Sequence, residues 1–349
     1  MRTTSISAAV GYARLAIISL VVMVPCTSWA EKHTFSITIE DTKITLVNQQ
    51  DFHTFAFNGQ VPGPLIHVKE GDEVTVNVEN LTTLPHTIHW HGLLQRGTWR
   101  MDGVPDTTQK SIEPGETFTY TFVAEPSGTM WYHCHVNVNE HVAMRGMWGP
   151  FIIDPKEPTA VEKEVTKDFI LMLSDWASAW AFKPGYGGVP GDVFDYFTIN
   201  GKAFPDSQPI RVTKGDIVRL RLIGAGEYAH AIHIHGHVFE VAFKDGRPLR
   251  ASYDADTISV NPGERYDLIL RANNPGLWMV HDHVDSHTVN GEKPMGGMMT
   301  VIEYAEIDTQ QPFYAWKDKQ FVPDFYYEES LKKPYGMHDA PAFKGAAIQ

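Results

Sequence analysis

Eight histidines occur in four pairs of the form His-x-His. Alternate residues of a β-strand point to the same face of a sheet, so each pair can present two imidazoles to one site. A single pair is most simply two hydrogen-bonded or surface histidines, whereas four pairs in matching positions indicate a metal centre. Imidazole suits copper, zinc, iron and nickel, so this ligand alone does not identify the metal. The four matching pairs are His89/His91, His133/His135, His233/His235 and His281/His283.

One cysteine, Cys134, lies between His133 and His135. If the two histidines face one way on a strand, the thiol faces the other way. A thiolate with two imidazoles and a weak thioether is the ligand set of a blue-copper electron-transfer site. Cys134 would then connect this copper to the histidines on either side of it by a few covalent bonds. The remaining candidate ligands are His86, His141 and Met147, with Met144 as an alternative thioether.

Other interpretations of Cys134 explain less of the sequence. A catalytic thiol needs a nearby base and an open cleft, and it leaves the other paired histidines unexplained. A structural zinc site usually has finger-like ligand spacing, which this sequence lacks. A buried, inert thiol is the commonest fate of a lone cysteine but gives no reason for the histidine pairs. Copper is therefore the favoured metal.

The metal-binding motifs occur twice, at an offset near 144 residues, which is the separation of His86 from His230. The segment HTIHWHG (86–92) returns as HAIHIHGH (230–237), and His-Cys-His returns as His281-Asp282-His283. A period this long indicates a duplicated domain. Because a carboxylate cannot form a copper–thiolate bond, we expect no blue copper in the second copy. We expect Asp282 to be hydrogen-bonded to His230 or His287, as a buried carboxylate requires.

Short β-branched or alternating runs, punctuated by Gly, Pro and Asn, predict an all-β protein made of sandwiches. Runs such as EVTVNVEN and TFTYTFVA are examples. The length suits about two domains. The predicted organisation is a signal peptide (1–30), a first domain (31–157), a second domain (158–304) and a C-terminal extension (305–349) that we assign to neither domain.

The first thirty residues predict export. Arg2 and Arg14 precede or flank an apolar run, and Ser28-Trp29-Ala30 offers small residues for a signal peptidase. The apolar run is too short to span a bilayer, so we expect cleavage near Ala30, a periplasmic or secreted location and no membrane anchor. The formal charge of −13 argues against nucleic acid as a partner and permits a cationic one.

Taken together, the motifs resemble those of the multicopper oxidases, the family of laccases and ascorbate oxidase. The resemblance covers roughly residues 50–300 and rests on HWHG, on HCH with a following His and Gly-Met-x-Gly, and on H-x-x-H-x-H-G-H. More narrowly, the chain resembles the two-domain, laccase-like oxidases whose type 1 copper lies in the first cupredoxin domain. The resemblance implies two tandem cupredoxin-like domains, each a Greek-key β-sandwich.

The resemblance also implies a role for each residue and four coppers per chain. His86, Cys134, His141 and Met147 resemble the type 1 ligands. His89 and His233 resemble the type 2 ligands, and the other six paired histidines resemble the ligands of the type 3 pair. Asp102 resembles a proton-relay carboxylate, although Asp-Gly also commonly forms turns. One departure is that His141 lies seven residues after Cys134, whereas many relatives place this histidine five residues after the cysteine, here Asn139.

Members of the family oxidise a donor by single electrons and reduce dioxygen to water with four. Either His86 or His141, at the rim of the type 1 site, would receive the electron. The donor could be a phenol, an aromatic amine, a metal ion or a small redox protein. The two-domain relatives imply a homotrimer with the trinuclear site between subunits.

Two other functions are compatible with parts of the sequence. A copper nitrite reductase has a similar domain arrangement, but it needs a catalytic aspartate where His89 stands and has no use for all four pairs. A copper-storage or electron-carrier protein is suggested only by Met295, Met298 and Met299, and methionine clusters more often serve packing.

Overall fold

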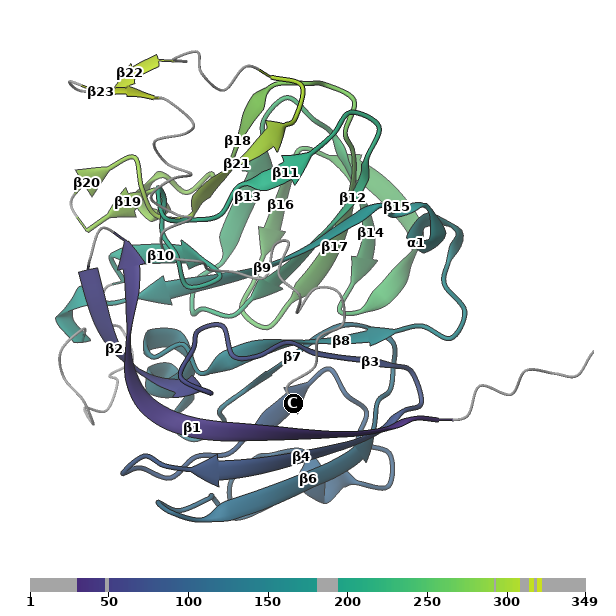
Figure 1. Ribbon diagram of the computed structural model, residues 1–349, viewed down its shortest axis with the longest axis vertical. Helices are drawn as coiled ribbons and strands as arrows, with labels where there is room; N and C mark the ends of the chain where they lie inside the picture. Colours follow the sequence, from purple (N-terminus) through teal and green to yellow (C-terminus); the bar gives the residue numbers. More distant parts are fainter. Residues whose placement is uncertain are drawn as a thin grey trace, which may run out of the picture. The chain divides into compact units, whose positions relative to one another are not determined.

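The computed structural model describes residues 30–47, 50–180, 194–291, 293–307, 314–316 and 319–321. The predicted signal peptide and most of the predicted C-terminal extension lie outside these residues. Within them, strands dominate, and both halves form paired β-sheets (Figure 1). The predicted all-β, cupredoxin-like fold is confirmed. No helix among the described residues is long and apolar enough to span a membrane.

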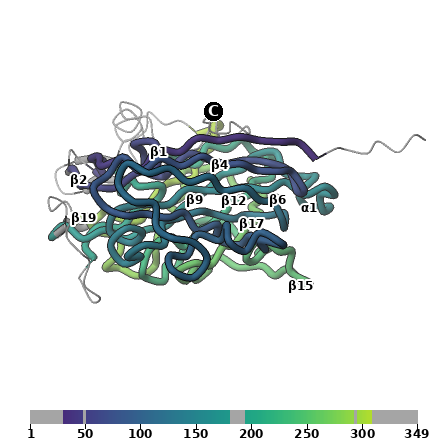
Figure 2. The backbone as a smooth tube through the Cα atoms, turned by 90° about the horizontal axis from the view of Figure 1, so that it is seen from below, coloured from purple at the N-terminus to yellow at the C-terminus, as the bar shows by residue number. Residues whose placement is uncertain are grey.

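The first half contains two four-stranded sheets. One has the order β2-β1-β4-β6 and the other the order β3-β8-β7-β5. β1 lies beside β4 in both views (Figures 1 and 2) and runs parallel to it, and β3 runs parallel to β8. The elements are β1 (Lys32–Val47), β2 (Gln50–Phe57), β3 (Ile66–Lys69), β4 (Glu73–Asn80), β5 (His89–His91), η1 (Trp99–Met101), β6 (Thr117–Val123), β7 (Gly128–His133), η2 (Asn139–Met144) and β8 (Trp148–Asp154).

The core of the first half follows from residue alternation. Along β4, every second residue is buried, which places Val74, Val76 and Val78 on one face. These valines pack in one cluster with residues from both sheets, among them Trp90 and Tyr132. Cys134 belongs to the same cluster, so the predicted metal-binding thiol lies at the edge of the hydrophobic core.

The second half contains an eight-stranded sheet and a five-stranded sheet. Their orders are β15-β14-β17-β12-β9-β10-β19-β20 and β11-β21-β18-β13-β16. A two-stranded pair, β22-β23, follows in the C-terminal part. The elements are α1 (Ala160–Glu164), β9 (Lys167–Trp176), η3 (Ser178–Trp180), β10 (Tyr196–Ile199), β11 (Ile210–Val212), β12 (Ile217–Gly224), β13 (His230–Ile234), β14 (Phe239–Lys244), β15 (Arg247–Ala255), β16 (Thr257–Val260), β17 (Arg265–Arg271), β18 (Leu277–Asp282), η4 (Asp285–His287), β19 (Val289–Asn290), β20 (Lys293–Pro294), β21 (Met299–Tyr304), β22 (Tyr314–Trp316) and β23 (Lys319–Phe321).

Two kinds of contact join the halves. Trp131 and Trp148 of the first half pack in one apolar cluster with Ile170 and Trp176 of the second. A buried polar contact accompanies this cluster, because Thr129 Oγ1 donates to Asp267 Oδ1 at 2.7 Å. The halves therefore share a core and are not two separate units joined only by a linker.

Asp267 is the acceptor at the centre of this polar contact. It is almost fully buried and lies 2.5 Å from a guanidinium nitrogen of Arg219 and 3.8 Å from one of Arg221. Burial alone would raise the pKa of Asp267, but the charges of Arg219 and Arg221 hold it below its usual value. The carboxylate thus compensates two buried cations.

We predict that Asp267→Asn destabilises the protein by about 3–5 kcal/mol, because it removes the fully buried carboxylate of the network and leaves Arg219 and Arg221 with only their less buried partners Glu162 and Asp168. Urea denaturation measures the loss. The matched control is Glu164→Gln, which breaks an exposed ion pair with Arg271 and should cost less than about 1 kcal/mol. Equal losses for the two variants would show that the buried network contributes no special stability.

Candidate metal centres

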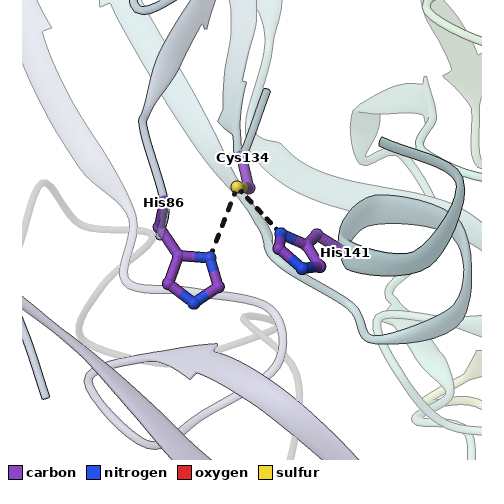
Figure 3. A group of neighbouring side chains, drawn as sticks. All are labelled: His86, Cys134 and His141. Atoms are coloured by element: carbon purple, nitrogen blue, oxygen red, sulfur yellow. Dashed lines mark hydrogen bonds between the residues drawn. The ribbon is translucent and has the colours of Figure 1, made fainter. Parts of the chain in front are cut away.

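Cys134, His86 and His141 meet in one buried cluster (Figure 3). Cys134 directly follows β7, His141 lies on the π-helical turn η2, and His86 lies just before β5, where its backbone pairs with Ile112. The Nδ1 atoms of His86 and His141 lie 3.6 Å and 3.4 Å from Cys134 Sγ. The structure thus brings together three of the four predicted type 1 ligands.

These separations fit a metal ion held between the ligands. With metal–sulfur and metal–nitrogen bonds of about 2.3 and 2.0 Å and near-trigonal angles, the sulfur and nitrogen would lie roughly 3.6 Å apart. Burial lowers the pKa of His86 to about 2 and that of His141 to about 4, so both imidazoles are neutral and able to bind a metal. Burial raises the pKa of Cys134 to about 11 in the absence of a cation. A bound metal would supply the positive charge that a buried thiolate needs.

The two candidate methionines occupy different surroundings. Met147 packs in the same apolar cluster as Cys134. Its carbonyl accepts from the Cys134 amide at 3.1 Å, and its amide donates to the His141 carbonyl at 2.9 Å. Met144 packs instead in the core of the second half, with Phe169 and Leu171. The arrangement favours Met147 as the fourth ligand.

The first-half histidine pairs come together across two antiparallel strands. His89 on β5 pairs with His133 on β7, and the rings of His89, His91, His133 and His135 lie 5.2–5.9 Å apart in the neighbouring pairs. His89 Nδ1 is 2.7 Å from the Asp102 carbonyl, and His133 Nδ1 is 2.8 Å from the Cys134 carbonyl. The backbone carbonyls thus direct the Nε2 atoms of these two rings toward the metal-binding side, and His133 Nε2 lies 3.4 Å from His91 Nδ1.

The second-half pairs repeat this arrangement in a more open setting. His233 on β13 pairs with His281 on β18, and the His281 Nδ1 atom again bonds to the next carbonyl, that of Asp282, at 2.8 Å. His235 Nε2 and His281 Nε2 lie 3.1 Å apart. His235 and His283 are exposed, whereas their counterparts His91 and His135 are partly buried.

The structure does not unite all eight histidines within one chain. Among the described residues, ring contacts and hydrogen bonds connect the histidines within each group, and none connects His89, His91, His133 or His135 with the second-half group. Each group by itself offers four imidazoles. A centre that needs ligands from both halves is therefore incomplete in one copy.

Asp282 takes the position of the cysteine in the second half. Its Oδ2 atom accepts from His230 Nδ1 and His287 Nδ1, both at 2.7 Å, so the hydrogen bonding predicted for this carboxylate is confirmed. The amides of Ala231 and Val284 donate to its other oxygen. These 2.7 Å contacts are direct hydrogen bonds, shorter than the 3.4–3.6 Å separations around Cys134.

Several residues that contact these clusters were not predicted from the sequence. Asp175 on β9 lies 3.0 Å from His230 Nε2, and Thr82 Oγ1 lies 2.9 Å from His86 Nε2. Arg145 and Phe55 lie beside the Cys134 cluster. None carries a local motif, and only the tertiary fold places them there.

The fold and the clusters define a cupredoxin-type protein with a mixed cysteine–histidine centre and two histidine groups. Two multicopper oxidase family models match the chain, over residues 38–158 and 175–304. The chain is 70% identical to the blue copper oxidase of Nitrosomonas europaea, with a TM-score of 0.81. The match covers 91% of this chain and 100% of that one. The chain belongs to the multicopper oxidase family.

More distant relatives extend this picture. Laccase-1 of Cryptococcus neoformans var. grubii is 36% identical over 244 residues, which is 63% of this chain and 38% of that protein. The chain thus spans about two-fifths of the length of this curated relative. The copper nitrite reductase of Nitrosomonas europaea is 22% identical with a TM-score of 0.64, and this likeness shows the fold alone.

Arg145 places a buried positive charge beside the Cys134 cluster. Its Nη1 donates to the His53 carbonyl at 2.8 Å, and its Nη2 lies 3.5 Å from Glu140 Oε1. The guanidinium lies 5.8 Å from the Phe55 ring, which contacts the rings of both His86 and His141. After burial, the charge of Arg145 is the second cause that lowers the pKa of His141.

We predict that Arg145→Met makes a copper ion bound by the Cys134 cluster harder to reduce, because a fixed cation disfavours the more positive oxidised state. At an effective dielectric constant of about 20, the change should be roughly tenfold in the reduction equilibrium, or about 59 mV for one electron. Optical redox titration of the blue band measures it. Glu140→Gln should shift the potential the opposite way, and the exposed Arg100→Met should leave it unchanged. Identical potentials for all four proteins would contradict the assignment.

His230 makes stability depend on pH. Burial alone would lower its pKa, but Asp175 and Asp282 hold the protonated ring and raise the pKa to about 9. A raised pKa adds stability that is complete below the unfolded value near 6.5 and is lost as the pH rises through 9. We predict a falling free energy of unfolding between these pH values, measured by urea denaturation. His230→Gln should abolish this decline, and an unchanged decline in that variant would exclude His230 as its source.

Proposed function

We propose that the chain is a laccase-like oxidase that couples one-electron oxidation of a donor to four-electron reduction of dioxygen to water. The observation that carries the proposal is the position of Cys134. Its sulfur belongs to one buried cluster, while the adjacent His133 and His135 belong to the other. The carbonyl of Cys134 also accepts from His133 Nδ1 at 2.8 Å. This arrangement gives a short bonded path between a site for single electrons and a site for several.

The residues fit the copper that the family implies. His86, Cys134, His141 and Met147 would hold the type 1 copper, and the eight paired histidines would hold the type 2 copper and the type 3 pair. When bound, these coppers would accept single electrons at one site and deliver four to dioxygen at the other. Burial lowers the pKa of His86, His91 and His141, which favours their neutral, metal-binding form. Backbone carbonyls fix the orientation of His89, His133 and His281.

The donor would give its electron at one of the two histidines of the type 1 site. Both candidate histidines are buried, His86 at 0% and His141 at 2% exposure. The Nε2 of His86 is also engaged by Thr82. We infer that electrons reach the site through His141. The donor that we propose is a phenol or an aromatic amine, with a metal ion or a small redox protein as alternatives.

A ring of three copies would complete the second centre. The support is that the two histidine groups are separate within the chain and that His235 and His283 of the second group are exposed. A head-to-tail interface that closes by rotation lets the first-half group of one copy meet the second-half group of the next. The proposed location is periplasmic or secreted, after removal of the leader near Ala30.

Copper content and dioxygen uptake test the proposed function. The ligand set predicts about four coppers per chain in the loaded protein, and dioxygen uptake with phenols. About two coppers per chain, with nitrite consumed and no dioxygen uptake, would support a nitrite reductase instead. Sedimentation of the same sample should give a trimer.

Asp102 is the proposed proton donor at the dioxygen site. Its carboxylate oxygen lies 3.6 Å from His89 Nδ1, and its backbone carbonyl holds the same ring nitrogen at 2.7 Å. We predict that Asp102→Asn slows dioxygen uptake by about 10²-fold or more, within the range for loss of a general acid. The blue colour should persist, because the backbone carbonyl still orients His89. Turnover equal to that of the wild type at every pH would exclude this role.

A further inference from the structure

Cleavage after Ala30 would leave a mature chain that begins Glu31-Lys32-His33. We propose that this N-terminus is a further binding site for a square-planar divalent metal ion, Cu(II) in the exported protein. The proposal rests on cleavage at Ala30, and it does not depend on the proposed oxidase function. It places the site outside both histidine groups and outside the Cys134 cluster.

The sequence provides four nitrogen donors in the right covalent order. They are the α-amino nitrogen of Glu31, the amide nitrogens of Lys32 and His33, and the Nδ1 atom of His33. With a histidine at the third position, the four nitrogens close two five-membered rings and one six-membered ring around a single ion. Tetragonal nitrogen ligation favours Cu(II) and Ni(II). Binding releases the ammonium proton and two amide protons to solvent, since the donors must be deprotonated.

The structure already holds the imidazole and the terminal nitrogen through one carboxylate. Asp72, which is 4% exposed, has its Oδ2 atom 3.0 Å from His33 Nε2 and its Oδ1 atom 3.0 Å from the Glu31 backbone nitrogen. Among the described residues, no hydrogen bond engages His33 Nδ1. A carboxylate on the far ring nitrogen is the usual partner of a metal-bound histidine, and it fixes the ring with the other nitrogen free.

The start of β1 can turn to meet an ion without disturbing the core. β1 pairs with β4 from Lys32 onward, whereas its pairing with β2 includes no residue before Ile39. The first buried residue of the strand is Phe35. Turning residues 31–33 would cost the pairing of Lys32 and His33 with β4 and the 2.8 Å hydrogen bond from the Glu73 amide to the Glu31 carbonyl. The carboxylates of Glu31 and Asp72 would attract a cation to this end of the strand, whereas that of Glu73 is paired with Lys32 at 2.8 Å.

The test uses the exported, copper-loaded protein and Ni(II) as the probe, because the copper centres are then already filled. Mass spectrometry first establishes the mature N-terminus. We expect Glu31 as the first residue and one Ni(II) per chain, with the visible absorption of a square-planar nickel complex. Asp72→Asn should weaken binding by about 10–100-fold, the usual cost of losing the partner of a metal-bound histidine.

Two variants separate this site from adventitious binding. His33→Gln removes the imidazole, and a glycine inserted before Glu31 moves His33 to the fourth position while keeping every side chain. Each should weaken Ni(II) binding by more than about 100-fold, because a ligand is lost and not only its partner. Their blue absorption and dioxygen uptake should be unchanged, so a failure here is distinct from a failure of the oxidase proposal. A different mature N-terminus, no bound nickel, or equal binding by these variants would overturn the site.

Discussion

The alternation of side chains at the end of β7 is the constraint on which the rest of the structure depends. His133 and Cys134 are neighbours in the chain and turn to different clusters, so one strand end serves two centres. The neighbouring elements place further ligands on each face of this strand end. β5 pairs beside β7 and brings His89 and His91 to one face, while the π-helical turn η2 brings His141 to the other. Moving this strand by one residue would exchange the two faces and lose both clusters.

The two halves place different residues at the equivalent position between two histidines. In the first half, a thiol and two neutral imidazoles stand 3.4–3.6 Å apart, a spacing suited to an ion between them. In the second half, Asp282 closes that space with direct hydrogen bonds to His230 and His287. A carboxylate and a protonated imidazole compensate one another in a dry interior, so the second-half residues are held together by an ion pair. The absence of a blue copper in this half stays a prediction.

The sequence was most informative where chemistry follows chain spacing. His-x-His on strands, Cys134 facing away from its neighbours and the hydrogen bonds of Asp282 all follow from local periodicity or from the repeat. Arg145, Thr82 and Asp175 could not be predicted, because they approach the clusters from other strands and loops. The sequence already favoured Met147 over Met144 through its Gly-Met-x-Gly context, and the structure adds that Met147 packs in the same apolar cluster as Cys134, whereas Met144 packs in another. The placement of His86 or His141 at the rim of the type 1 site stays a prediction, and both side chains are buried in one copy of the chain.

The central claim is that the dioxygen site is divided between copies of the chain, and complementation tests it most directly. One variant, His91→Ala, damages the first-half group, and another, His281→Ala, damages the second. Each alone should fail to take up dioxygen. If the two are produced together in one cell, mixed rings contain some interfaces at which both groups are intact, and the account predicts that dioxygen uptake returns. Uptake that stays absent in mixed rings, with both chains shown to be present, would contradict a site shared between copies.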